Sequence, residues 1–444
     1  MRELRFYGAL WIAKAVAFLI NVVAKGRGTN LPGAVALKID PQFLRHVRGI
    51  NPEKTVFLTG TNGKSTTTKL LNQILTGAGY RVVSNLGGAN MTAGVAVPLL
   101  NSCSLTGKLK CDYVVMETDE RYVSRIRKQI PAKYLSVTNV QKDQVQRNGE
   151  PSFIRDAIRD AIGEDMTVFV NRDEPNALSL VSAGGQNAIL YGVAPHQRSF
   201  TKADDFFAVT MPCPVCHEGL DFQQYNLDNV GQFACPACGF GSHMDAKYVT
   251  EEVSFEEKWF CLNGTRYPFG QPLPEFLYSY TQAVAIALEL GVAEADICKA
   301  LSGENSEIRQ PTHKLADHEV KYFRIKQENS ETFQSALNSI SADSQPKVMI
   351  LGLDEYIDFH PPYINGCYLF DCSLEALRKS GVERCITTSP ALGQCGALRF
   401  VYDGFDPASI QVLPDSREAT LAQALDGEKT ENIYLIEEIP FWKQ

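Results

Sequence analysis

The sequence predicts an α/β fold with two domains built on mostly parallel sheets. Two observations predict it. Short apolar runs alternate with helix-length segments through most of the chain, which is the pattern of βαβ units. The chain is also 444 residues long, too long for one hydrophobic core. We therefore expect a larger domain followed by a smaller, Rossmann-like α/β domain.

Composition and charge narrow the class of protein. Hydrophobic residues make up 44% of the chain and charged residues 21%, which indicates a globular protein rather than a disordered or collagen-like chain. The net charge of −8 argues against nucleic acid as the main partner, because a phosphate backbone favours a concentrated basic surface. We expect no nucleic-acid partner.

The first 48 residues predict a helix and a lead-in segment. Residues 6–24 are apolar apart from Lys14 and Asn21, with arginines before this stretch and Lys25 and Arg27 after it. A signal peptide or a marginal transmembrane span has the same outline. Because Lys14 splits the run, we favour a helix that packs on the protein or lies in a membrane interface. We interpret the protein as cytoplasmic, with peripheral contact at the inner membrane face left open.

Residues 49–305 are expected to form the larger domain. Its apolar runs predict strands and its helical periodicity predicts helices. The expected strands are 55–59, 81–84, 113–116, 134–138 and 167–170, and the expected helices are 65–76 and 277–290.

Residues from about 205 to 245 interrupt this pattern and predict an inserted zinc ribbon. The segment is poor in aliphatic periodicity and carries two CxxC pairs, Cys213, Cys216, Cys235 and Cys238. Two such pairs 18 residues apart supply four thiolates for tetrahedral zinc. Because four thiolates leave no open position for water, we expect a structural site. The other eight cysteines are scattered, which suits buried thiols in a reducing compartment.

Residues 306–444 are expected to form the smaller domain. We predict strands at 320–325, 347–353, 367–370, 384–387 and 432–436, and helices around 333–340 and 374–380. No internal repeat is evident.

A glycine-rich loop between a predicted strand and a predicted helix indicates a phosphate site. Glycines allow backbone N–H groups to approach phosphate oxygens, and the helix N-terminus adds partial positive charge. Lys64 would reach the β- and γ-phosphates, and the Ser65 hydroxyl would bind magnesium. Leu58 stands where the general pattern has glycine, so the loop is a variant; the plainer reading is a glycine turn with a surface lysine. The loop consists of Gly60, Thr61, Asn62, Gly63, Lys64, Ser65 and Thr66.

Glu117 is the candidate second magnesium ligand. It ends the predicted strand 113–116 and opens the acidic run 117–120. Ligands of open parallel sheets bind at the carboxyl ends of the strands, so a carboxylate there suits the metal. The alternative is a solvated acidic turn.

Several further motifs resemble the Mur ligase superfamily and, within it, the MurT family. The loop 60–66 matches the superfamily's nucleotide loop. Residues 85–91 resemble the family's Asn-x-x-Gly-Ala-Asn segment, and residues 138–150 are close to its Thr-Asn-x-x-x-Asp-Gln-x-x-Arg-x-Gly-Glu run. Residues 26–33 match its N-terminal signature, and the Cys₄ insertion is characteristic of it. The resemblance is good over residues 25–245 and weaker beyond.

The resemblance implies an ATP-dependent ligase. MurT-type subunits use MgATP to phosphorylate the α-carboxylate of D-glutamate in the lipid II stem peptide. Ammonia from an associated glutaminase subunit, GatD, attacks the acyl phosphate and gives D-isoglutamine. The implied cofactors are ATP, Mg²⁺ and structural Zn²⁺. The implied partners are a GatD-like glutaminase and the lipid-linked peptidoglycan precursor.

The resemblance also assigns residues to the site. Lys64 and Glu117 would be catalytic, and Asn139, Asn171, Asp173 and Arg309 would join the loop in ATP binding. Asp358, with Asp354 in reserve, would complete the glutaminase's catalytic triad.

Departures lie in the second half. The helix at 275–283 lacks the superfamily's adenine-contacting asparagines. Arg309 lacks the glycine that normally precedes it.

Two alternatives to the amidotransferase subunit stay open, and these departures motivate the second of them. One is a stand-alone Mur-type or folylpolyglutamate-type ligase that joins a free amino acid. The other is a degenerate scaffold that keeps the fold and zinc but has lost turnover, a reading that intact Lys64, Ser65 and Glu117 oppose.

Overall fold

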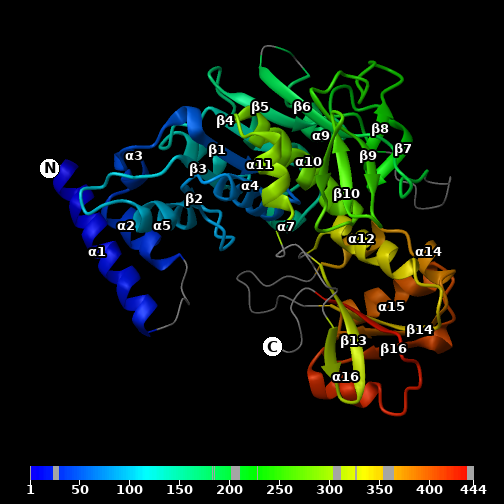
Figure 1. Cartoon of the computed structure of the whole chain (residues 1–444). Coiled ribbons are helices and arrows are strands. Elements are labelled where there is room, and N and C mark those ends of the chain that lie inside the picture. Colours follow the sequence, from blue (N-terminus) through cyan, green and yellow to red (C-terminus); the bar gives the residue numbers. More distant parts are fainter. Residues whose placement is uncertain are drawn as a thin grey trace. The chain divides into compact units, whose positions relative to one another are not determined.

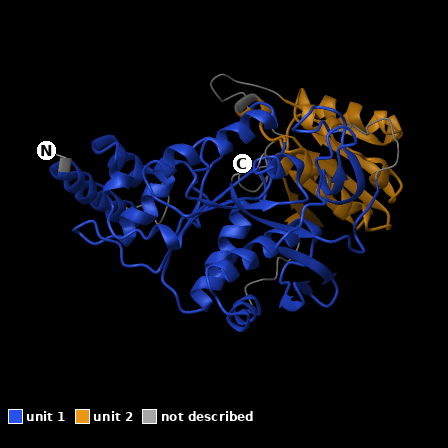
Figure 2. Cartoon of the chain, turned by 90° about the horizontal axis from the view of Figure 1, so that it is seen from above, with its two compact units in different colours: residues 1–141, 149–202, 210–307 blue, residues 142–148, 203–209, 308–444 orange. Residues whose placement is uncertain are grey.

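The computed structural model describes residues 2–23, 30–182, 184, 186–201, 211–227, 229–303, 312–325, 328–353 and 365–437. The chain divides into two compact units (Figure 2). The first comprises residues 1–141, 149–202 and 210–307, and the second comprises residues 142–148, 203–209 and 308–444. The predicted α/β fold class is confirmed, while the domain boundaries at 48/49 and 305/306 stay predictions.

The first unit is built on a nine-stranded sheet in the order β11-β10-β9-β6-β5-β4-β1-β3-β2. Strands from β2 to β9 in that order pair in parallel, and β10 and β11 add antiparallel at one edge. The strands are β1 Thr55–Thr59, β2 Val82–Ser84, β3 Tyr113–Glu117, β4 Tyr134–Val137, β5 Thr167–Asn171, β6 Asn187–Val193, β9 Tyr248–Ser254, β10 Trp259–Leu262 and β11 Thr265–Pro268.

Helices cover both faces of this sheet, which explains its continuously apolar strands. Along β1, Val56 and Leu58 share a core with α4 Lys64–Gly77, α10 Pro274–Glu289 and α11 Glu294–Leu301. Phe57 points the other way, because successive strand side chains alternate. Its core includes side chains of α1 Arg2–Val23, α2 Leu31–Ile39, α3 Phe43–His46, α5 Thr92–Ser102, α6 Val123–Arg127, α8 Pro151–Arg159 and α9 Pro175–Leu178. Helices α1, α2, α3 and α5 gather at the N-terminal end of the first unit (Figure 1).

The opening helix α1 is present and packs on α2 and α5. Within the described residues it is the one helix whose length and composition would suit a membrane span, and 28% of its apolar window is buried inside the protein.

The predicted insertion contributes a separate two-stranded sheet. Strand β7 Asp221–Leu227 pairs antiparallel with β8 Val230–Ala234. One CxxC pair precedes β7 and the other follows β8.

The second unit has a six-stranded sheet in the order β12-β13-β17-β14-β15-β16, parallel except for the β12–β13 pair. Helices α12–α15 share a core on one face and α16 contributes to the core on the other, which is the predicted Rossmann-like arrangement. The elements are α7 Val145–Asn148, β12 Thr312–Leu315, β13 His318–Arg324, α12 Ser330–Ser341, β14 Lys347–Gly352, α13 Cys367–Phe370, α14 Glu375–Arg378, β15 Val382–Thr388, α15 Leu392–Tyr402, β16 Ile410–Leu413, α16 Glu418–Ala424 and β17 Ile433–Glu437.

One element was predicted wrongly. Residues 367–370 form the short helix α13, not a strand. A four-residue apolar run fits a buried strand and a buried helical turn equally well. Here Tyr368 packs edge-on against Phe333 of α12, with ring centroids 5.9 Å apart, and Asn365 accepts the backbone N–H of Cys367 at the helix start.

Candidate active site

The glycine-rich loop follows β1 and leads directly into α4. Its glycines are required by geometry. Gly60 has φ 122° and Gly63 has φ 83°, in the left-handed region that other residues avoid. A Cβ on Gly60 would lie 2.3 Å from Oγ1 of Thr138 and 2.7 Å from the carbonyl O of Asn139. The strand-loop-helix context predicted for residues 55–76 is therefore present.

Asn139, two residues after β4, holds the loop through three hydrogen bonds. Its carbonyl accepts the N–H of Thr61 at 2.9 Å, its Oδ1 accepts the N–H of Asn62 at 2.8 Å, and its Nδ2 donates to the Asn62 carbonyl at 3.2 Å. Gln141 continues the contact, because its N–H donates to Oγ1 of Thr61 at 2.9 Å and its Oε1 accepts from Nδ2 of Asn62 at 3.1 Å. Asn139 therefore holds the loop, and Gln141 is a contributor that no sequence motif singled out.

Lys64 lies at the first position of α4, with its side chain turned back over the loop. Its Nζ is 2.8 Å from Oε1 of Glu120, and it also donates to the carbonyls of Gly60 and Thr61. Both charged side chains are about 90% buried. Burial strengthens the attraction between the two charges but also costs their hydration. Sequence reasoning missed Glu120, although it named the acidic run that contains it.

Ser65 and Glu117, the two residues predicted to bind magnesium, lie next to each other. Oγ of Ser65 donates to Oε2 of Glu117 at 2.7 Å, and Nδ2 of Asn90 donates to Oε1 at 3.1 Å. Asn85 fixes the end of β3, because its side chain accepts the N–H of Glu117 and donates to its carbonyl, both at 2.8 Å. The adjacent hydroxyl and carboxylate oxygens are hard donors of the kind that magnesium prefers, so these residues fit that ion. Residues 85–91 thus serve to position Glu117.

Asn171 is the last residue of β5 and Asp173 lies in the turn that follows, and both are buried. Oδ2 of Asp173 accepts the N–H of Val193 at 2.7 Å and the hydroxyl of Tyr278 at 3.0 Å, and Oδ1 is 3.1 Å from Nε of Arg172. Burial raises the pKa of Asp173 above its usual value. Oδ1 of Asn171 accepts the N–H of Asp173. These side chains tie β5, β6 and α10 together.

Glu174 is a second buried carboxylate beside this turn. It accepts the N–H groups of Val140 at 2.9 Å, Asn176 at 3.1 Å and Ala177 at 2.8 Å. Burial raises its pKa to about 7 despite these three hydrogen bonds. Because Val140 directly follows Asn139, Glu174 connects the turn after β5 to the segment whose Asn139 side chain holds the phosphate loop.

Three predicted site residues cannot be placed. Arg309, Asp354 and Asp358 lie outside the described residues.

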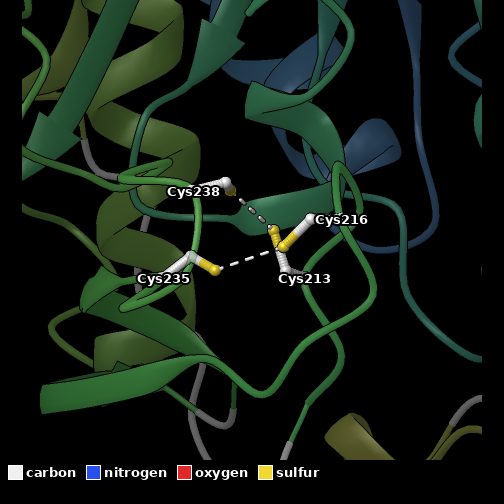
Figure 3. A group of neighbouring side chains, drawn as sticks. All are labelled: Cys213, Cys216, Cys235 and Cys238. Carbon is white, nitrogen blue, oxygen red and sulfur yellow. Dashed lines mark hydrogen bonds between the residues drawn. The ribbon is translucent and has the colours of Figure 1, made fainter.

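The four cysteines of the insertion converge on one point (Figure 3). All four Sγ atoms lie within 4.8 Å of one another, with Cys213 3.7 Å from Cys238 and Cys216 3.5 Å from Cys235. Tetrahedral zinc with Zn–S bonds of about 2.3 Å separates its sulfurs by about 3.8 Å, so the cluster fits a Cys₄ zinc site. All twelve cysteines lie in described parts of the chain, and none of them forms a disulfide.

The cysteine cluster is anchored to the first unit. Cys213, Phe233 and Phe240 belong to the core that also contains Ile154 and Ile158 of α8. In addition, Nη1 of Arg155 donates to the carbonyl of Pro214 at 3.0 Å. A metal held by this cluster would therefore be structural and would hold the β7–β8 hairpin against α8.

The sequence is similar to proteins of peptidoglycan synthesis. Residues 58–212 match the Mur ligase middle domain. The chain is 31% identical over 309 residues to the lipid II isoglutaminyl synthase (glutamine-hydrolyzing) subunit MurT of Streptococcus pneumoniae (strain ATCC BAA-255 / R6), covering 68% of this chain and 67% of that protein. It is 26% identical over 398 residues to subunit MurT of Staphylococcus aureus (strain COL), covering 87% and 85%.

Solved structures share the fold. A pseudomurein peptide ligase type C from Methanothermus fervidus superposes with a TM-score of 0.66 at 17% identity, covering 89% of this chain and 78% of that one. MurF from Acinetobacter baumannii superposes with a TM-score of 0.60 at 15% identity, covering 92% and 78%.

Proposed function

This chain belongs to the MurT family of Mur-ligase-like subunits, and we propose that it is the synthetase subunit of an ATP-dependent amidotransferase. Its substrate would be the D-glutamate α-carboxylate of lipid II, and its product D-isoglutamine. The observation that carries the proposal is the convergence of Lys64, Ser65 and Glu117 where a glycine-rich loop enters a helix. The names of the MurT relatives supply the substrate class.

Lys64 would stabilise the transferred phosphoryl group. Its ammonium lies over the loop beside Glu120, so a γ-phosphate would compete with that carboxylate for the same charge. Backbone N–H groups at the start of α4 would receive the remaining phosphate oxygens. We propose that Gly60, Thr61, Asn62, Gly63 and Thr66 line the phosphates, and that Asn139 holds the loop in the shape this requires.

Ser65 and Glu117 would hold magnesium. The ion neutralises charge on the β- and γ-phosphates during phosphoryl transfer. Asn85 holds the Glu117 backbone through two hydrogen bonds, and Asn90 donates one to the Glu117 carboxylate. For Asn171 and Asp173 we propose a supporting role in the nucleotide site, exerted through the β5, β6 and α10 positions that they fix. Arg309 stays a candidate for direct ATP contact.

The reaction follows from carboxylate chemistry. A carboxylate is a poor electrophile, so an oxygen of the D-glutamate α-carboxylate would first attack the γ-phosphorus and release ADP. Ammonia would then attack the acyl carbon, the amide would form, and inorganic phosphate would leave. No side-chain nucleophile is needed.

A second chain would supply the ammonia. The MurT relatives are named as subunits of a glutamine-hydrolyzing enzyme. We therefore propose a GatD-like glutaminase partner, in a heterodimer or a higher assembly, with Asp358, or Asp354 in reserve, contributing to its triad. The need for ATP and the twelve cysteines, none of which forms a disulfide, fit a cytoplasmic location.

An amidation assay tests the proposal. The purified complex is given a D-glutamate-containing lipid II, ATP, magnesium and ammonium chloride, which bypasses the glutaminase. Lys64→Ala should abolish the formation of D-isoglutamine. Lys69→Ala is the matched control, because Lys69 lies on the same helix but is exposed. Amidation at the normal rate in Lys64→Ala would exclude the proposed role of the loop, and turnover with a free amino acid in place of ammonia would indicate a stand-alone ligase.

A further inference from the structure

The outward face of α1 is a continuous apolar stripe. Six large side chains of this helix are each between 51% and 78% exposed: Leu4, Trp11, Ile12, Phe18, Leu19 and Val22. At 100° per residue they fall within an arc of about 120° and extend over about 27 Å. Isolated exposed apolar residues are ordinary, but a stripe of this length marks an interaction surface.

The opposite face of α1 is packed in the core of the protein. Ala9, Leu10 and Ala13 are fully buried in the core shared with α2 and α5. Phe6 packs so closely on Gly107 that a Cβ there would lie 2.4 Å from its ring. A helix held in this way would have to leave its core to cross a bilayer, so the stripe is available only for contact along its length.

A neighbouring turn extends the stripe. Nε1 of Trp11 donates to the carbonyl of Leu105 at 3.0 Å, and the Leu105 side chain is itself 66% exposed. Lys108 and Lys110 follow that turn and are exposed. Trp11 and Leu105 therefore lie at a turn that two exposed lysines follow in the sequence.

The positive charge of the N-terminal region indicates what binds to the apolar stripe. The first 50 residues hold eight basic and two acidic residues, a net charge of +6, whereas the chain as a whole carries −8. Of the two acids, Asp40 is buried against Nδ1 of His46. On the helical projection, Arg5 and Lys14 flank the two edges of the apolar arc. An apolar stripe bordered by cations suits an anionic lipid surface, whose headgroups attract the cations while its acyl boundary takes up the apolar side chains.

We propose that α1, with Leu105, docks this protein on an anionic membrane surface, lying parallel to it with the stripe from Leu4 to Val22 in the headgroup–acyl boundary. The inference does not rest on the proposed amidation, because it concerns a face remote in sequence from the phosphate loop. It assigns to the N-terminal helix a second role besides packing on α2 and α5.

Vesicle co-sedimentation of the full-length protein tests the proposal. Wild type should pellet with vesicles of phosphatidylglycerol and phosphatidylcholine, and about tenfold less with phosphatidylcholine alone. The double variant Leu4→Gln/Phe18→Gln removes two apolar side chains without changing charge, and should bind the anionic vesicles at least about tenfold more weakly. The matched control is Leu398→Gln/Tyr402→Gln, which alters two exposed apolar residues of α15 and should bind like wild type.

Four outcomes would overturn the proposal. Equal vesicle binding by wild type and Leu4→Gln/Phe18→Gln would show that the stripe is not the binding surface. No vesicle binding by wild type would show that the protein does not dock on a membrane. Resistance of the bound protein to carbonate extraction would indicate a spanning helix. A wild-type dimer that the same variant dissociates would show that a second copy covers the face. Circular dichroism confirms that the variant is folded, and its ammonium-dependent amidation in detergent reports on the proposed function separately.

Discussion

The Nζ of Lys64 and Oε1 of Glu120 lie 2.8 Å apart in a buried ion pair. This pair joins the first turn of α4 to the acidic run after β3, where Glu117 meets Ser65. The site is therefore organised around two carboxylates of one run, three residues apart, with different partners. Glu120 neutralises the lysine, and Glu117 presents an oxygen beside the serine hydroxyl.

Glu120→Gln is expected to make the nucleotide-free protein less stable and ATP binding tighter. The substitution leaves a buried ammonium without the carboxylate 2.8 Å away, and breaking a buried pair in this way costs about 3 kcal/mol. A phosphate would then no longer compete with the Glu120 carboxylate for Lys64. Chemical denaturation and ATP titration measure the two effects. Glu53→Gln, which removes the exposed partner of Lys133, should change neither, and unaltered ATP affinity in Glu120→Gln would contradict the competition.

Glu117→Gln is expected to lower turnover by about 100-fold and to raise the magnesium concentration needed for half-maximal rate. An amide oxygen carries no full charge and binds a hard cation more weakly than a carboxylate does. A magnesium titration of ATP-dependent amidation provides the measurement. A decrease in rate with an unchanged magnesium requirement would indicate that Glu117 acts without the ion.

Cys213→Ser with Cys235→Ser is expected to abolish zinc binding and to destabilise the first unit. One zinc per chain should be found in the wild type by elemental analysis, because the sulfur spacing fits a Cys₄ site. Loss of a structural zinc removes several kcal/mol of folding free energy. Cys111→Ser, outside the cluster, is the control. Full zinc content in the double serine variant would contradict the assignment.

The pH dependence of stability should contain a contribution from Glu174. Its pKa is raised from 4.5 to about 7, so the folded protein binds this proton more tightly than the unfolded chain does. The resulting cost to stability is absent below pH 4.5, grows as the pH rises to 7 and is constant above it. The free energy of unfolding of wild type and of Glu174→Gln should be measured by denaturation from pH 4 to pH 8. Over this range the stability of the variant relative to the wild type should increase by up to about 3 kcal/mol. A pH-independent difference would show that this carboxyl does not titrate in that range.

Much of the fold could be predicted because many of its strands and helices are determined by residue patterns that lie within the element itself. Strand β1 was predicted at its observed bounds, since a strand covered on both faces is a continuous apolar run. Strands β9–β11 were not predicted. They lie at the sheet edge, and the exposed Glu251 and Glu252 of β9 interrupt its apolar pattern. The helix at 367–370 was predicted as a strand, because only its tertiary packing against α12 decides between the two.

The candidate site likewise contains residues that the sequence indicates and residues that only the tertiary structure reveals. Lys64, Ser65 and Glu117 could be named as candidates because a glycine-rich loop and a strand end carry their own sequence signature. Glu120 and Gln141 could not, because their roles exist only once β3 and β4 flank β1 and bring them to the loop. Asp173 is a third case: the resemblance assigns it to ATP binding, and its side chain accepts hydrogen bonds from Val193 and Tyr278, which hold β5, β6 and α10 together.

The most direct test of carboxylate phosphorylation is to follow an isotope label from the substrate carboxylate into the released phosphate. Lipid II with ¹⁸O in both oxygens of the D-glutamate α-carboxylate is converted by the complex with ATP and ammonium, and the released phosphate is analysed by mass spectrometry. The account predicts one ¹⁸O in each phosphate formed, with none transferred in Lys64→Ala. Amide formation with unlabelled phosphate would contradict phosphorylation of the carboxylate and, with it, the proposed role of the loop.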